Sequence, residues 1–438
     1  MSERMSSITY PITVPAIRVV QPLGVFYVVA LPARVLLDTA YSDRLRAKRI
    51  HGGQSYELQG AQRELLTPRL REIGAYISTE ESTFPNSIIL APNFDPESGQ
   101  QEDDVSIRWR VDECESADAP GGKFFILTIP SPAALAPIID GQHRLFGFNY
   151  CDRSERLDEQ LVCSIFIDLP KPFQAFLFAT INSNQKPVNK SQTYDLFGYN
   201  IEKEPPESWS PDKLAVFLAR KLNSEEDSAL RGRILIAADN DFAMSRSEAK
   251  RQGLWMVSMA VVVEGISRLV SQNAKRDRTA LLRLPAGERK REMLSSESPS
   301  DKAPLRQLYL ESNDKVVFAA VKNFFSAADK IFWSRCKSES FICKTVGIQA
   351  LFDTLTELCR EGLQKKTFSI QFFEERLSRA GDIDFSGRFF QNASGSGRQT
   401  IRTCLFLRLG FRTPDELPED DIAPILEALN GHWGTRLD

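Results

Sequence analysis

The feature of this sequence that most constrains its fold is an abrupt change of pattern within residues 138–150. Two β-branched residues, Ile138 and Ile139, precede an Asp-Gly pair, and an amphipathic run follows at once. This pattern predicts a buried strand that breaks at Gly141 and restarts as a helix. The first N–H groups of such a helix have no intrahelical partner, and the positive end of its dipole lies behind them. The corner is therefore a candidate seat for a phosphate or carboxylate.

Two side chains at the start of this helix favour the same interpretation. His143 and Arg144 fall in its first turn, where they can close over an anion, and a planar guanidinium suits phosphate oxygens. A structural alternative remains open, in which Asp140 caps the helix and Arg144 pairs with a surface carboxylate. Spacing alone does not separate the two interpretations.

Whole-chain properties exclude several classes of protein. The 438 residues, of which 42% are hydrophobic and 26% charged, suggest two globular domains, with three as the alternative. Seven cysteines without a CxxC pair and three scattered histidines argue against a zinc site or a disulfide framework and favour a reducing cytosol. The N-terminus has no signal pattern, and the most apolar run, 254–263, is too short to span a bilayer. We expect a soluble, cytoplasmic protein with no membrane partner.

Strand and helix patterns are interspersed up to residue 199. We expect strands at 25–30, 87–90, 105–111, 124–129 and 162–167. We expect helices at 33–40, 61–77 and from Pro172 onward. The strands at 105–111 and 124–129 would form a hairpin with a long loop. The strand at 162–167 shows little polar alternation, which indicates a central position in the sheet.

A segment dense in amide side chains follows the helix that starts at Pro172. Pro187 disfavours helix in the residue before it, so the helix must end nearby. In the functional interpretation, the amides of residues 182–185 form a polar wall that faces the Gly141 turn. Taken alone, they are better explained as a helix C-cap and turn.

The corner resembles a known family. Residues 140–144 match the signature of the DGQHR-domain family, the group containing DndB and DpdB, which accompanies bacterial DNA phosphorothioate and 7-deazaguanine modification systems. The likeness spans roughly 25–199. Gln62 and Arg63, followed by 84–89, look like the family's N-terminal part, and 181–188 looks like its second motif. The resemblance implies DNA and other proteins of a modification system as partners.

The same region is similar, more distantly, to the ParB and sulfiredoxin fold. Residues 141–147 align without gaps with the boxes that hold nucleoside triphosphate in ParB and ATP phosphates in sulfiredoxin. Gln142 replaces the catalytic cysteine of sulfiredoxin, so no thiolate is available for that chemistry. In ParB's second box Asn182 is retained, but Ile181 replaces the glutamate and Gln185 the arginine. A nucleotide pocket can survive these changes, whereas hydrolysis by the ParB mechanism cannot.

The resemblance therefore implies that the corner binds ATP or another nucleoside triphosphate, with Mg²⁺ if the nucleotide is hydrolysed. The expected nucleotide-binding residues are Gly141, Gln142, His143, Arg144, Gln185, Gln62 and Arg63. Asp140 and Asn182 are the expected catalytic and metal-binding residues.

Beyond residue 200 the pattern becomes mostly helical. Helices are expected at 214–222, 255–270, 316–332, 346–363, 370–380 and 415–429. We therefore predict an α/β (α+β) protein with a ParB/sulfiredoxin-like domain, built on a mixed sheet, at 1–200. A mainly α-helical domain at 201–438 would follow it and bind DNA or a protein partner.

Positive charge gathers at 275–291, although the net charge of the chain is -3. Such a patch could bind the phosphates of DNA, but a run of charges like this one more commonly forms a solvated, partly disordered loop. The DNA-binding candidates are Lys275, Arg276, Arg278, Arg289 and Lys290. The Ser-Gly-Ser-Gly-Arg stretch at 394–398 is a second candidate anion loop, although it lacks the lysine and spacing of a P-loop.

Three classes of function compete. The first is a nucleotide-binding protein, with or without ATPase activity, that supports or regulates DNA modification. The second is a non-catalytic DNA-binding regulator of the modification operon. The third, a ParB-like nuclease, is disfavoured because no clustered carboxylates or metal-binding histidines occur near the motif. Nucleotide turnover and formation of a homodimer are left open.

Overall fold

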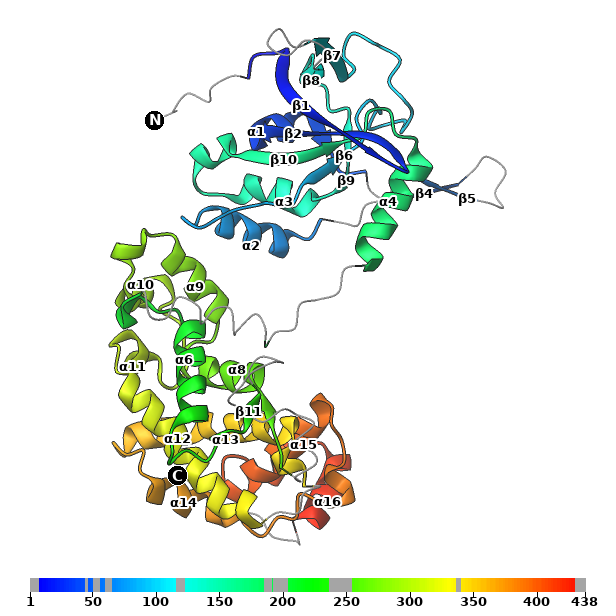
Figure 1. The fold of residues 1–438 in the computed structure, drawn as a ribbon. Helices are drawn as coiled ribbons and strands as arrows, with labels where there is room; N and C mark the ends of the chain where they lie inside the picture. Colours follow the sequence, from blue (N-terminus) through cyan, green and yellow to red (C-terminus); the bar gives the residue numbers. More distant parts are fainter. Residues whose placement is uncertain are drawn as a thin grey trace. The chain divides into compact units, whose positions relative to one another are not determined.

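The chain divides into two compact units, Met1–Pro187 and Val188–Asp438. The computed structural model, drawn in Figure 1, describes residues 8–43, 46–49, 56–59, 65–115, 123–184, 191, 204–235, 254–335 and 340–429. No helix in these ranges is long and apolar enough to cross a membrane. The N-terminal unit mixes strands and helices, and the C-terminal unit is mostly helical.

An eight-stranded mixed sheet forms the centre of the N-terminal unit, in the order β3-β9-β6-β10-β2-β1-β8-β7. Its strands are β1 Ile12–Gln21, β2 Gly24–Pro32, β3 Ala40–Tyr41, β6 Ile88–Leu90, β7 Arg110–Glu115, β8 Lys123–Ile129, β9 Ala136–Asp140 and β10 Gln160–Ile165. The pairs β10–β6 and β3–β9 are parallel, and the other pairs are antiparallel. A separate two-stranded pair consists of β4 Arg46–Arg49 and β5 Tyr56–Gln59.

Strand β10 lies within the sheet, as predicted, but only one of its faces is buried. Leu161, Cys163 and Ile165 belong to the hydrophobic core, whereas Val162 is 37% exposed. The same core receives Leu145 from α3 Gln142–Gly147. The other helices of this unit are α1 Ala33–Thr39, α2 Thr67–Ile77 and α4 Lys171–Asn184. Helix α2 packs against α3, and α4 contacts β9.

Two strand predictions differ from the structure. The strand expected at 105–111 begins only at Arg110, because Asp104 accepts hydrogen bonds from the backbone N–H and the hydroxyl of Ser106 and holds a turn there. The hairpin with the strand near 124–129 is nevertheless confirmed as the pair β7–β8. Strand β1 was not expected, because Pro15 interrupts its sequence pattern.

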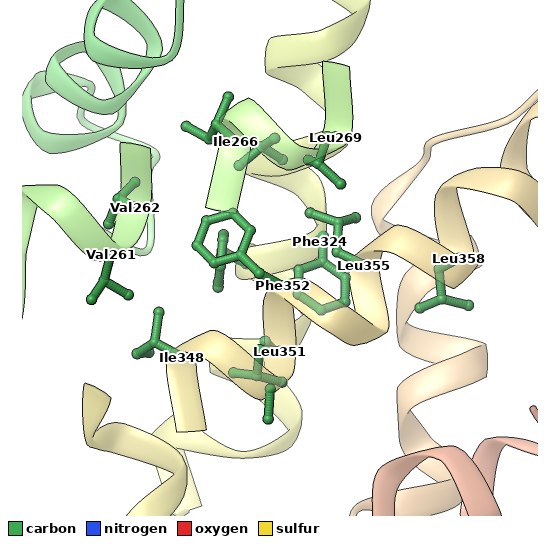
Figure 2. Close-up of a cluster of buried hydrophobic side chains, with 14 of the residues drawn as sticks. Val261, Val262, Ile266, Leu269, Phe324, Ile348, Leu351, Phe352, Leu355 and Leu358 are labelled. Carbon is green, nitrogen blue, oxygen red and sulfur yellow. The ribbon is translucent and has the colours of Figure 1, made fainter. Parts of the chain in front are cut away.

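The C-terminal unit packs its helices around one hydrophobic core. These helices are α6 Pro211–Ser224, α8 Met259–Val270, α9 Ala274–Leu282, α10 Leu294–Glu297, α11 Arg306–Leu310, α12 Asp314–Ile331, α13 Thr345–Gln364, α14 Ile370–Leu377, α15 Gly395–Leu409 and α16 Glu419–Ala428. The short strands β11 Ile234–Leu235 and β12 Val257–Ser258 pair in parallel. Figure 2 shows the core between α8, α12 and α13, where Phe352 and Phe324 lie among aliphatic side chains.

Close packing of α8 on α13 depends on a glycine. A Cβ atom at Gly265 would lie 2.4 Å from the ring of Phe352, so no larger residue fits without movement.

The last helix is shorter than the predicted 415–429. Residues Pro414–Glu416 form only a 3-10 turn, and α16 begins at Glu419, directly after Pro418. Pro418 ends the turn because proline restricts the residue before it to extended backbone.

Candidate functional site

The predicted strand–glycine–helix corner is present. Strand β9 ends at Asp140, Gly141 adopts a left-handed φ of 98°, and α3 starts at Gln142. A Cβ atom at Gly141 would lie 2.6 Å from Cδ1 of Ile88, so both conformation and space require glycine. Because α3 has only six residues, its dipole is weak, and any anion site here must depend on side chains as well.

Arg144 already has two partners at this corner. Its Nη2 donates to Oδ2 of Asp140 at 2.8 Å, and its Nη1 donates to the carbonyl of Asn86 at 2.6 Å. The side chains of Arg144 and Asp140 are 21% and 28% exposed. Asp140 therefore compensates the charge of Arg144. The alternative in which Asp140 caps α3 is wrong, because α3 has no side-chain cap hydrogen bond. The guanidinium still has other N–H donors, since an arginine carries five.

Gln142 has a structural role. It is buried, and its Oε1 accepts a hydrogen bond from the hydroxyl of Ser42 at 2.6 Å. This contact ties the start of α3 to the segment after β3. The amide of Gln142 is thus directed to the protein interior, and only its backbone belongs to the corner.

His143 lies between α3 and the start of α2. Its Nε2 accepts the N–H of Leu66 at 3.4 Å. Burial, and after it the charge of Arg69, lowers the pKa of His143 below its usual value, which favours the neutral imidazole. Arg69 is exposed in the first turn of α2 and was not anticipated from the sequence. Only the packing of α2 on α3 brings it near the motif.

Two glycines permit this packing. A Cβ atom on Gly147 would lie 2.4 Å from Cγ2 of Ile73, and one on Gly74 would lie 2.5 Å from the carbonyl oxygen of Tyr150, in the 3-10 turn that directly follows α3. The close contact between the helices explains how Arg69 comes to influence His143. A glycine at each contact point was the one sequence signal that could have indicated it.

The other predicted nucleotide-site residues are not described in detail. Gln62, Arg63 and Gln185 lie outside the described residues. Asn182 belongs to α4, which contacts β9, but its side chain is not described. Within the described ranges, no group of three or more His, Cys, Asp or Glu residues could hold a metal ion.

The basic segment 275–291 is ordered, which corrects the prediction of a solvated loop. Most of it forms α9 and short 3-10 turns. Asn273 caps α9 by accepting the N–H of Arg276 at 3.0 Å. Arg291, which is 1% exposed, forms an ion pair with Asp314 at 2.5 Å.

Several of the predicted DNA-binding side chains have internal partners. Arg278 pairs with Asp212 at 2.7 Å, and Arg289 is 5% exposed and donates to a backbone carbonyl. Arg276 is exposed but donates to the carbonyl of Glu297 at 2.6 Å. Lys275 and Lys290 are exposed. The segment therefore presents less positive charge to solvent than its composition suggests.

No family model matches the chain, and no curated protein or solved structure shows significant similarity to it. The described architecture is a mixed α/β unit with an eight-stranded sheet, followed by a mostly helical unit. The likeness to DGQHR-domain and ParB-like proteins therefore rests on the motif residues alone.

Proposed function

We propose that the N-terminal unit binds a nucleoside triphosphate, with ATP as the expected ligand, at the Gly141 corner. We further propose that the protein serves a bacterial DNA-modification system. The observation that carries the proposal is the D-G-Q-H-R sequence at a strand–glycine–helix junction, with His143, Arg144 and Arg69 around it. Backbone N–H groups at such a junction and cationic side chains beside it are the usual means of binding phosphate.

The Asp140–Arg144 pair is compatible with this role. Asp140 and the Asn86 carbonyl hold the guanidinium in one orientation, so less side-chain entropy is lost when an anion binds. Both side chains are partly exposed, which leaves them accessible to a ligand. Asp140 would hold Mg²⁺ together with phosphate oxygens, because Mg²⁺ in nucleotide sites commonly takes only one or two carboxylates from the protein.

Binding is better supported than hydrolysis. Ile181 stands where the ParB-like box has a glutamate, and the described ranges contain no group of three or more His, Cys, Asp or Glu residues that could hold a metal ion. Nucleotide occupancy would then regulate or support modification without requiring turnover. The DNA-binding regulator remains the competing function, with exposed Lys275 and Lys290 as its strongest support.

The test is a titration of labelled ATP, with and without Mg²⁺, and of duplex DNA, against the wild type and Arg144→Ala. We expect Arg144→Ala to weaken ATP binding by about tenfold or more, because a charge-assisted contact is lost, and to leave DNA binding largely intact. Arg108→Ala is the matched control. Its ion pair with Asp168 at 2.7 Å has similar exposure, at 23% and 37%, and lies outside the motif.

Two outcomes would contradict the proposal. One is an equal loss of ATP affinity in both variants, which would indicate a general effect on stability. The other is absence of ATP binding together with DNA binding that weakens steeply as salt rises, which would support the regulator.

A further inference from the structure

The helical unit contains a polar cavity of about 290 Å³ that has no part in the proposed nucleotide site. It is lined by residues of α6, α8, α9, α13 and α15. Three of these helices contribute a residue near their N-terminus, namely Asp212, Ala274 and Arg398. The positive ends of three helix dipoles therefore lie at the border of the cavity.

Two arginines at the cavity share one carboxylate. Arg398 binds Asp353 through both oxygens, with Nε at 2.8 Å and Nη2 at 2.6 Å. Arg268 approaches the same carboxylate at only 3.3 Å and has a side chain that is 41% exposed. Arg268 donates from Nη1 to Asp353 and from Nε to the carbonyl of Glu264, both at 3.3 Å. An arginine carries five N–H donors, so Arg268 retains donors for a further anion.

Acidic side chains also line the cavity and restrict its ligand. Asp212 is buried, and Arg278 compensates its charge at 2.7 Å. Glu264 interacts with other residues of the protein and lies on α8, the same helix as Arg268. A ligand for this site should therefore carry hydrogen-bond donors as well as a negative group.

A polar group without a partner among the described residues also borders the cavity. Ser267 is 6% exposed, and its buried hydroxyl has no hydrogen-bond partner within the described part of the chain. The half-buried side chain of Gln349 also lines the cavity. Buried polar groups are satisfied in most native structures, so an unsatisfied hydroxyl beside a cavity suggests a missing ligand or water.

We propose that this cavity binds a small phosphate monoester, with the phosphoryl group on Arg268 and Arg398. The remainder of the ligand hydrogen-bonds to Ser267 and Gln349. The volume is near the lower end for small-molecule sites and suits a nucleoside monophosphate or a sugar phosphate. The Ser-Gly-Ser-Gly-Arg stretch, which the sequence marked as an anion loop, thus contributes through Arg398 at the start of α15. The site is independent of the Gly141 corner.

Calorimetric titration of the full chain with inorganic phosphate, AMP, ribose 5-phosphate and adenosine tests this proposal. We expect both monoesters to bind more tightly than phosphate, and adenosine to bind least. Arg268→Gln should weaken monoester binding by about tenfold, because a charge-assisted contact is lost. Arg360→Gln is the control, since Arg360 pairs with Glu357 at 2.6 Å on the surface of α13. Unchanged monoester affinity in Arg268→Gln would overturn the proposal.

Two further variants keep the result interpretable. Ser267→Ala removes a hydroxyl that has no partner, so the ligand-free protein should be as stable as the wild type while AMP binds several-fold more weakly. Arg144→Ala should leave the binding of ribose 5-phosphate unchanged, which separates this cavity from the proposed ATP site. Wild-type affinity in Ser267→Ala, or loss of ribose 5-phosphate binding in Arg144→Ala, would refute the assignment.

Discussion

At the scale of single residues, Gly141 has the most demanding position in the candidate site. Its left-handed φ of 98° and the nearby Cδ1 of Ile88 both oppose a side chain. The need for glycine at this turn was predictable from the Asp-Gly pair between a strand pattern and a helix pattern. The contact of Arg144 with the Asn86 carbonyl was not, because only the tertiary fold brings these two residues together, whereas Asp140 is a local i,i+4 partner.

Gly141→Ala should lower the free energy of unfolding by about 2 kcal/mol, since it adds both backbone strain and a steric clash. Gly99→Ala is the control, because Gly99 has a φ of 70° but no atom within 4 Å of the added Cβ. It should cost about 1 kcal/mol. Urea denaturation of both variants measures the difference, and equal losses would show that the contact with Ile88 has no influence.

At the scale of elements, the periodicity of the sequence predicted most helices and strands, and the exceptions have local causes. A side-chain turn at Asp104 delays β7, and Pro418 delays α16. The segment 275–291 was mistaken for a loop because its charges were assumed to be solvated. Arg278 pairs with Asp212 and Arg291 with Asp314, both on distant elements, and sequence spacing cannot show such pairs.

The cap of α9 offers a direct test of why that segment is ordered. Asn273→Ala should destabilise the protein by about 1 kcal/mol, because the N–H of Arg276 loses its acceptor. Asn313→Ala is the control, since Asn313 precedes α12 without a side-chain cap hydrogen bond. Chemical denaturation compares the two variants, and losses of equal size would mean that the Asn273 cap does not stabilise α9.

At the scale of the whole molecule, the sequence indicated a strand-rich N-terminal part and a helical C-terminal part. The order of the eight strands could not be predicted, because β1 lies between β2 and β8, and β8 follows more than 100 residues later. The same long-range pairing, together with the packing of α2 on α3, places Arg69 near His143. The corner was thus predictable as a backbone feature, whereas its electrostatic surroundings depend on the complete fold.

The central claim is that a triphosphate binds at the Gly141 corner, and His143 can act as its probe. In the free protein, burial and Arg69 lower the pKa of His143. A bound triphosphate should favour the imidazolium and raise that pKa, so ATP affinity should increase as pH falls between the two values.

The measurement is an NMR pH titration of the three histidines, with and without ATP, in which His143→Gln identifies the signal. We predict that ATP raises the pKa of His143 and that this shift is absent in Arg144→Ala. An unchanged His143 titration under ATP concentrations that saturate binding would contradict the account, because the nucleotide would then lie elsewhere.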